Sequence, residues 1–188
     1  GVDAVDLPGV GHEEGRVLFV SRLEHQKGAL DAMSVLKALT EEDSRVQGVV
    51  VGEGSLAADV RRAAESSDGR IEFLGALDRE ALSTQYARAA IVLMPSRFEG
   101  LGMVALEAQA AGTPVVGFDV DGLRDAVGIG GVLVPPGDLA ALCAAAMQLL
   151  DDPERRAEAG ARGREVVLAE HSWDAIGKRL EEIYTSVR

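Results

Sequence analysis

The stretch VVVGEGSLAADV, residues 49–60, runs from a block of valines through a glycine-rich turn into a segment with a helical pattern. A short apolar run without alternation is typical of a strand in a parallel sheet whose two faces are both covered. The same succession of apolar run, turn and helix recurs along the chain. Strands are expected at residues 17–21, 48–51, 71–74, 90–94, 114–118 and 131–134. Helices are expected at residues 27–40, 56–66, 79–88, 101–111, 139–150, 153–169 and 173–187.

The alternation of six strands with helices predicts an α/β fold, a doubly wound, mostly parallel, six-stranded Rossmann-like sheet with helices on both faces. A chain of 188 residues suffices for one domain or slightly more. Residues 1–14 lack periodicity and are interpreted as a linker-like start, and residues 172–188 as a closing helix. That helix carries an apolar stripe, which we expect to pack against another element. The stripe consists of Trp173, Ile176, Leu180, Ile183, Tyr184 and Val187.

Composition argues against several classes of function. The formal net charge of -12 disfavours a nucleic-acid partner, because phosphate neutralisation needs clustered Lys and Arg. No run of 18 uncharged apolar residues is present, so we expect no membrane span. A single cysteine, Cys143, cannot form an internal disulfide, which is consistent with a reducing, cytoplasmic location.

The glycine turn itself raises an alternative. Residues 52–57 read G-x-G-x-x-A, and Glu72 follows at about the offset at which a dinucleotide-binding fingerprint places an acid. That fingerprint normally follows the first strand of its unit, whereas this turn follows the second. Glu72 also falls inside the expected third strand and not at its carboxyl end. The sequence therefore disfavours a dehydrogenase and predicts that Gly52 makes a tight strand-to-helix turn beside a nucleotide.

Charged residues and glycines follow the strands at the edge where doubly wound sheets bind ligands. Arg22 and Lys27 follow the first strand, and a Gly-Leu-Gly turn after the fourth strand separates Glu99 from Glu107. Two cations and a glycine turn that opens a helix suit a diphosphate, because free N–H groups and the helix dipole favour negative charge. Eight residues span about 12 Å along a helix, so the two glutamates suit a ribose on one side of the diphosphate and a sugar on the other.

Four stretches carry a family resemblance: SRLEHQKG (21–28), VVVGEGSL (49–56), IEFLGAL (71–77) and MPSRFEGLGMVALEAQAAGTPVVGFDVDGL (94–123). They resemble the C-terminal, donor-binding half of retaining group 1 glycosyltransferases with the two-domain GT-B fold. The resemblance extends from GVDAVDLP at residues 1–8 to HSWDAIGKRLEEIY at residues 171–184. Its most specific part is the E-x7-E spacing of Glu99 and Glu107 around the glycine turn.

The resemblance implies a role for each of these residues. Arg22 and Lys27 would bind the diphosphate of the donor and act with Glu99, which would face the transferred sugar, as the catalytic set. Glu107 would hold the ribose hydroxyls, and Leu77 would pack against the base. The donor-binding set is Gly52, Leu77, Gly100, Leu101, Gly102, Met103 and Glu107. Two positions depart from the family pattern: Leu101 stands where Phe is common, and Asp121 stands where many members carry Gly.

By the same resemblance, the intact enzyme would transfer a sugar from a nucleotide-diphosphate sugar to an acceptor with retention of anomeric configuration. The acceptor would bind an N-terminal domain absent from residues 1–188, so this chain alone is expected to be inactive. No metal and no cofactor are expected, since no Asp-x-Asp is placed to hold a metal diphosphate and none of the three histidines is proposed as catalytic. A GT-B-like nucleotide-sugar epimerase and a non-enzymatic nucleotide-binding module are the alternatives. The base, the sugar, the acceptor and peripheral membrane contact of the intact enzyme stay open.

Overall fold

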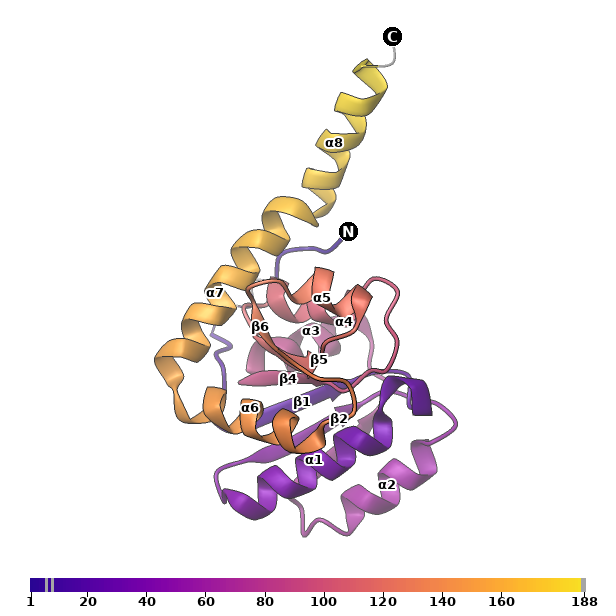
Figure 1. Ribbon diagram of the computed structural model, residues 1–188, viewed down its shortest axis with the longest axis vertical. Coiled ribbons are helices and arrows are strands. Elements are labelled where there is room, and N and C mark those ends of the chain that lie inside the picture. Colours follow the sequence, from indigo (N-terminus) through magenta and orange to yellow (C-terminus); the bar gives the residue numbers. More distant parts are fainter. Residues whose placement is uncertain (6, 8, 187–188) are drawn as a thin grey trace.

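A single parallel sheet forms the centre of the molecule (Figure 1). The computed structural model describes residues 1–5, 7 and 9–186. Neighbouring strands pair in parallel in the order β3-β2-β1-β4-β5-β6, which confirms the predicted doubly wound Rossmann-like fold. The strands are β1 (Arg16–Val20), β2 (Gln47–Val51), β3 (Ile71–Gly75), β4 (Ile91–Met94), β5 (Val115–Phe118) and β6 (Gly131–Val134).

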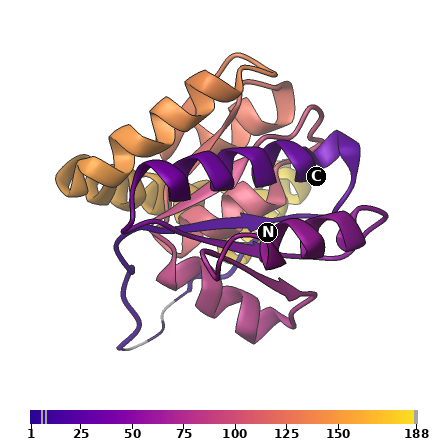
Figure 2. The same ribbon diagram turned by 90° about the horizontal axis from the view of Figure 1, so that it is seen from below.

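Helices cover both faces of the sheet. One face packs against α1, α2 and α6, and Figure 2 shows α1 lying between the other two. The opposite face packs against α3, α4, α5 and α7. The helices are α1 (Ala29–Glu42), α2 (Ala57–Glu65), α3 (Arg79–Arg88), α4 (Met103–Ala110), α5 (Asp121–Val127), α6 (Leu139–Asp151), α7 (Pro153–Glu170) and α8 (Trp173–Ser186), with a 3-10 turn η1 (His25–Lys27) before α1.

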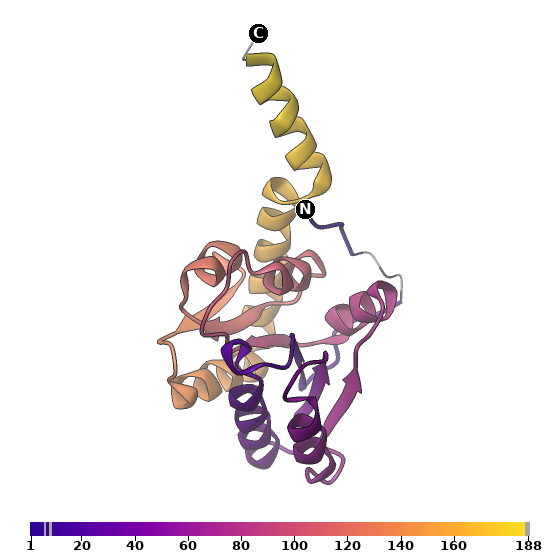
Figure 3. The same cartoon turned by 90° about the vertical axis from the view of Figure 1, so that its right-hand side faces the viewer.

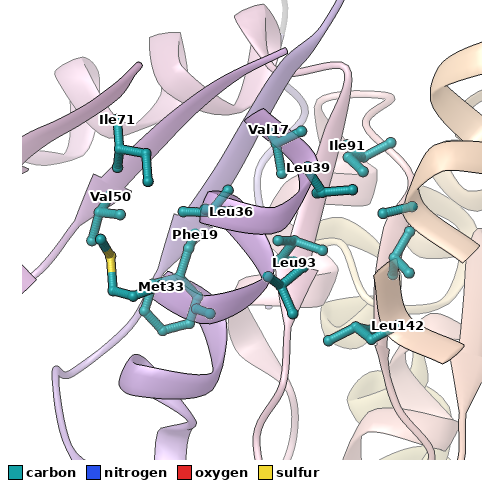
Figure 4. Packing of buried hydrophobic residues seen from close by; sticks show 14 of the residues in the cluster. Val17, Phe19, Met33, Leu36, Leu39, Val50, Ile71, Ile91, Leu93 and Leu142 are labelled. Carbon is teal, nitrogen blue, oxygen red and sulfur yellow. The ribbon is translucent and has the colours of Figure 1, made fainter. Parts of the chain in front are cut away.

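Alternate residues of each strand point to opposite faces, and this alternation builds two apolar cores. In β1, Val17 and Phe19 pack in the core under α1, whereas Leu18 and Val20 pack in the core of the other face. Figure 4 shows the first core, in which Phe19 lies beside Leu36 and Leu93. Because both faces are covered, β1 is buried along its whole length. This explains why the strands read as continuous apolar runs in the sequence.

The strand order determines where the topological switch point of the sheet lies. After β1 the chain builds β2 and β3 on one side, and it then returns through α3 to place β4 on the other side of β1. The loops that follow β1 and β4 therefore start on either side of the topological switch point, where doubly wound sheets bind ligands at the carboxyl ends of the strands. Residues 21–28 and 95–102, which carry most of the expected site, are these two loops.

One helix was not expected, and two others begin two residues later than expected. The helix α5 was not predicted, because its seven residues include two aspartates and a glycine and read as a turn. The helix expected from residue 27 begins at Ala29, since Gly28 adopts a left-handed conformation with φ of 70°. The helix expected from residue 101 begins at Met103 for the same reason, since Gly102 has φ of 64°.

The last helix, α8, rises away from the body of the domain in Figures 1 and 3. None of its described residues is buried, and Tyr184 is 73% exposed. Of the residues expected in its apolar stripe, Val187 lies outside the described residues. Trp173 and Ile176 lie against Gly1, whereas Leu180, Ile183 and Tyr184 further along the stripe are exposed.

The N-terminal segment is tied to the base of α8. The Val2 N–H donates to His171 O at 2.9 Å, the Trp173 N–H donates back to Val2 O at 3.3 Å, and the Val2 side chain is buried. Among the described residues, no helix combines the length and the apolarity that a membrane crossing requires.

Candidate functional site

The glycine turn after β2 supports the loop after β1. The Leu23 N–H donates to Glu53 O at 2.8 Å, and the Leu56 N–H donates back to Leu23 O at 2.9 Å. A Cβ placed on Gly52, whose φ is 139°, would lie only 1.8 Å from Ser21 O. Only glycine allows the two loops to approach this closely. The turn therefore holds the first loop in position.

The acid that completed the apparent dinucleotide fingerprint lies elsewhere. Glu72 is the second residue of β3, pairs with Val49 and is exposed. A residue inside an edge strand does not reach a ligand beyond the carboxyl ends of the strands. This confirms the expectation that Glu72 lies inside the third strand, and it disfavours a nicotinamide site here.

The loops after β1 and β4 meet through an ion pair. Lys27 Nζ lies 2.8 Å from Glu99 Oε2, and the two side chains are only 16% and 10% exposed. The backbones of the two loops also touch, because the Arg97 N–H donates to Gln26 O at 2.9 Å. A Cβ on Gly28 would lie 2.1 Å from Pro95 O, so this approach again requires glycine. The structure thus brings Lys27 and Glu99 together at the switch point of the sheet.

The N-terminus of α4 opens beside this pair. The first bond of the helix runs from the Leu106 N–H to Gly102 O at 3.1 Å, so the N–H groups of Met103 and the next two residues precede the hydrogen-bonded ladder. Leu101 is 60% exposed at the rim of the turn. Such a helix end favours a negatively charged ligand.

The helix α5, which the sequence did not predict, packs closely against the turn at Glu99 and Gly100. A Cβ on Gly122 would lie 2.3 Å from Glu99 O and 2.7 Å from Gly100 O. The preceding Asp121 is exposed and pairs with Arg124 at 3.0 Å. Asp119 also pairs with Arg124, at 2.6 Å, so the acids of the DVD stretch face this arginine.

Arg22 and Leu77 lie on neighbouring loops of the same edge. The side chain of Arg22 is 68% exposed, and its guanidinium lies 3.9 Å from Glu24 Oε1. Leu77 is half-buried in the loop after β3, just before Asp78, whose side chain accepts a hydrogen bond from the Ala81 N–H and caps α3. The Gly52 N–H donates to Gly75 O at 2.8 Å and ties this loop to the turn after β2. The Arg22 side chain thus stands largely in solvent.

Glu107 belongs to a separate half of the site. Its Oε2 accepts a hydrogen bond of 2.9 Å from the hydroxyl of Tyr86 on α3. Tyr86 is 2% exposed, and burial, followed by the nearby Glu107 carboxylate, raises the pKa of its hydroxyl well above the ordinary value. The hydroxyl therefore stays protonated and donates at neutral pH. Both residues line a groove of about 740 Å³ between α3 and the N-terminal segment.

Tyr86 is the residue that the sequence did not reveal. The chain has only two tyrosines, and Tyr86 lies on the helix that follows the expected base-binding loop. That placement was a usable signal, but nothing in the pattern of α3 indicates which side chain of α4 it reaches.

A doubly wound sheet with a cation, a carboxylate and a helix N-terminus at its switch point, and a second carboxylate at the groove beside α3, is chemically suited to an anionic, hydroxyl-rich ligand. A family model described as "Glycosyl transferases group 1" matches residues 14–152. The chain belongs to this family.

Relatives and solved structures agree with this assignment. The chain is 36% identical to a GDP-mannose-dependent monoacylated alpha-(1-6)-phosphatidylinositol monomannoside mannosyltransferase of Corynebacterium glutamicum, over 88% of this chain and 46% of the relative. It thus spans about half the length of the curated relatives that it matches.

Among solved structures, S. aureus TarM in complex with Fondaparinux, alpha-GlcNAc-glycerol and UDP superposes with a TM-score of 0.85 at 22% identity, over 97% of this chain and 38% of TarM. The C-terminal domain of a group 1 glycosyl transferase (LpcC) from Francisella tularensis gives a TM-score of 0.75 at 20% identity, over 87% of this chain and 89% of that one. These likenesses show the shared fold, which is that of one half of a GT-B enzyme.

Proposed function

We propose that this chain is the donor-binding half of an enzyme that transfers a sugar from a nucleotide-diphosphate sugar to an acceptor with retention of anomeric configuration. The observation that carries the proposal is the Lys27–Glu99 pair at the switch point, 2.8 Å apart beside the N-terminus of α4. A cation and free backbone N–H groups suit a diphosphate, and carboxylates on either side accept hydrogen bonds from sugar hydroxyls.

In the proposed reaction the bond between the anomeric carbon and the diphosphate oxygen breaks, and the electron pair leaves with the diphosphate. The acceptor oxygen forms the new bond on the same face of the sugar, and its proton passes to the departing diphosphate. Lys27, Arg22 and the N–H groups at the start of α4 stabilise the negative charge that develops on the departing diphosphate. Glu99 accepts hydrogen bonds from the transferred sugar. We propose that these fixed positive groups take the place that a divalent cation has in other transferases, so that no metal or cofactor takes part.

The ribose and base are assigned to the other half of the site. Glu107 lies at the groove beside α3, where its carboxylate accepts the ribose hydroxyls, and Leu77 packs against the base. The name of one relative includes GDP-mannose, and TarM was solved with UDP. Both nucleotides are therefore candidates for this chain.

The other half of the reaction is assigned to residues outside this chain. Since the chain spans about half of its relatives, we propose that the acceptor binds a second domain and that the cleft between the domains is the complete active site. We also propose that the intact enzyme acts in the cytoplasm.

A binding panel tests the proposal directly. UDP, GDP and ADP are titrated calorimetrically against residues 1–188, with the matching nucleoside monophosphates as controls for the diphosphate contact. We expect one diphosphate to bind and its monophosphate to bind at least about tenfold more weakly, because a charge-assisted contact is lost. No transfer to any acceptor is expected from this chain. Failure of all three diphosphates to bind contradicts the proposed function.

Assays of the full-length protein separate the alternatives. A transferase consumes donor only with an acceptor and forms a glycosylated product. Isomerisation of the sugar on the intact nucleotide would indicate an epimerase. Tight nucleotide binding with neither reaction would indicate a non-enzymatic module.

A further inference from the structure

The carboxylate of Glu107 is held from behind by a buried hydroxyl. The Tyr86 hydroxyl donates to Glu107 Oε2 at 2.9 Å, and the tyrosine side chain is 2% exposed. Tyr86 comes from α3 and Glu107 from α4, so the bond links two helices that lie side by side on one face of the sheet. Glu107 itself is half-buried and faces the groove that the N-terminal segment borders.

The position of Tyr86 is itself tightly constrained. Its backbone carbonyl accepts a hydrogen bond of 2.6 Å from the hydroxyl of Thr113, which is fully buried in the loop after α4. The Ala89 N–H donates to the same carbonyl at 3.2 Å. The tyrosine ring lies in the apolar core of that face together with Leu106 and Leu18. A hydroxyl on a ring that cannot move is a fixed donor.

A fixed donor changes what the glutamate can do. A free glutamate side chain samples several rotamers, and a ligand that binds it must restrict them. A carboxylate has about four acceptor sites on its two oxygens, and Tyr86 occupies one of them on Oε2. Among the described residues no second hydrogen bond reaches this carboxylate, so its remaining acceptor sites, including both on Oε1, are available to the groove. The side chain is thus oriented before a ligand arrives.

We propose that Tyr86 is a positioning residue that orients the Glu107 carboxylate toward the 2′- and 3′-hydroxyls of the nucleotide ribose. The inference rests on the proposed function, because it takes the ligand of Glu107 to be a ribose. Discrimination between ribose and deoxyribose would then depend on the Tyr86 hydroxyl, which does not itself touch the nucleotide. Tyr86 remains a donor throughout the neutral pH range, because burial raises the pKa of its hydroxyl.

The test measures the ratio of the affinities for a ribonucleotide and for its 2′-deoxy counterpart, and not one affinity alone. UDP, GDP and ADP and their 2′-deoxy counterparts are titrated against residues 1–188 as wild type and as Tyr86→Phe. Phenylalanine keeps the ring and its packing and removes only the hydroxyl. Tyr184→Phe is the matched control, since Tyr184 is the other tyrosine and is 73% exposed on α8. The thermal midpoint of each variant is recorded to establish that it is folded.

We expect the wild type and Tyr184→Phe to bind the ribonucleotide about tenfold more tightly than the 2′-deoxynucleotide, because the hydroxyl donates to a charged acceptor. In Tyr86→Phe this ratio is expected to fall to about threefold or less, with most of the loss on the ribonucleotide. A Tyr86→Phe variant that loses affinity equally for both ligands would show a merely structural role and overturn the inference.

The outcomes of the wild type separate this inference from the proposed function. A diphosphate that binds without discriminating ribose from deoxyribose overturns the ribose assignment of Glu107, and the inference with it, but leaves the diphosphate site standing. Absence of diphosphate binding overturns the proposed function itself. A wild-type ratio that persists unchanged in Tyr86→Phe overturns the positioning role alone.

Discussion

Lys27 Nζ and Glu99 Oε2 lie 2.8 Å apart and join the loops that follow β1 and β4. The strand order places these loops on either side of the switch point, so the pair lies at the edge where doubly wound sheets bind ligands. Both side chains are largely shielded from solvent. Glu99 therefore pairs with the cation that the proposed diphosphate needs.

Replacing Glu99 tests this competition. Glu99→Gln removes the charge that holds Lys27 and keeps the shape of the side chain. We expect bare nucleoside diphosphate to bind as tightly as in wild type or up to about fivefold more tightly, the effect of releasing an ion pair worth about 1 kcal/mol. Transfer by the full-length enzyme should fall, because Glu99 would contact the sugar. Calorimetry and a transfer assay measure the two effects, and weaker binding of the bare diphosphate would contradict the competition.

Removing Lys27 should have the opposite effect on binding. Lys27→Ala is expected to weaken diphosphate binding by about 1.5–3 kcal/mol, because a hydrogen bond between charged groups is lost and Glu99 then stands unpaired near the phosphates. Lys37→Ala is the matched control, since the Lys37 side chain is 71% exposed on α1. Both variants are titrated with the nucleoside diphosphate. Equal affinities of Lys27→Ala and Lys37→Ala would show that Lys27 does not belong to the site.

The turn after β2 makes a prediction about stability. Gly52→Ala forces a side chain onto a residue with φ of 139° and places its Cβ against Ser21 O. We expect unfolding free energy to fall by about 2 kcal/mol or more. Gly177→Ala on α8 is the control, because nothing lies within 4 Å of its Cβ and alanine raises helix propensity by up to about 1 kcal/mol. Urea denaturation measures both, and a Gly52→Ala variant as stable as wild type would show that the loops can separate.

The buried tyrosine predicts an alkaline loss of stability. Burial, and next Glu107, raise the pKa of Tyr86 in the folded state well above its ordinary value of 10.0. The folded state therefore holds this proton more tightly than the unfolded state. The resulting stability is present below about pH 10 and is lost as pH rises from there through the folded pKa.

Urea denaturation between pH 8 and pH 11 measures this contribution to the unfolding free energy, because the range extends to both sides of the ordinary tyrosine pKa of about 10. We expect the unfolding free energy of Tyr86→Phe to fall less steeply above pH 10 than that of wild type. Tyr184→Phe, altered at an exposed position, should follow the wild type. Identical slopes for wild type and Tyr86→Phe would mean that the tyrosine keeps an ordinary pKa in the folded protein.

The sequence by itself determined the sheet and the edge at which doubly wound sheets bind ligands. Strands such as 48–51 and 90–94 are continuous apolar runs because parallel strands are buried on both faces, and this local pattern requires no knowledge of neighbours. The proximity of Lys27 to Glu99 was also foreseeable, since parallel strands bring their carboxyl ends to one edge. Gly28 and Gly102 mark the ends of these loops in the sequence, although their left-handed conformation shifted the helix starts by two residues each.

Only the tertiary structure decided which side chains meet across helices. The bond from Tyr86 to Glu107 depends on how α3 lies against α4, and the helical period of either segment leaves that rotation open. The seven-residue α5 is stabilised by packing under the Glu99–Gly100 turn, a contact that local propensity does not contain. The sequence pattern of α8 indicated an apolar face. Such a pattern does not identify the element that packs against the face. In the structure that face, from Leu180 to Tyr184, lies exposed because the domain's own sheet is already covered by α3, α4, α5 and α7.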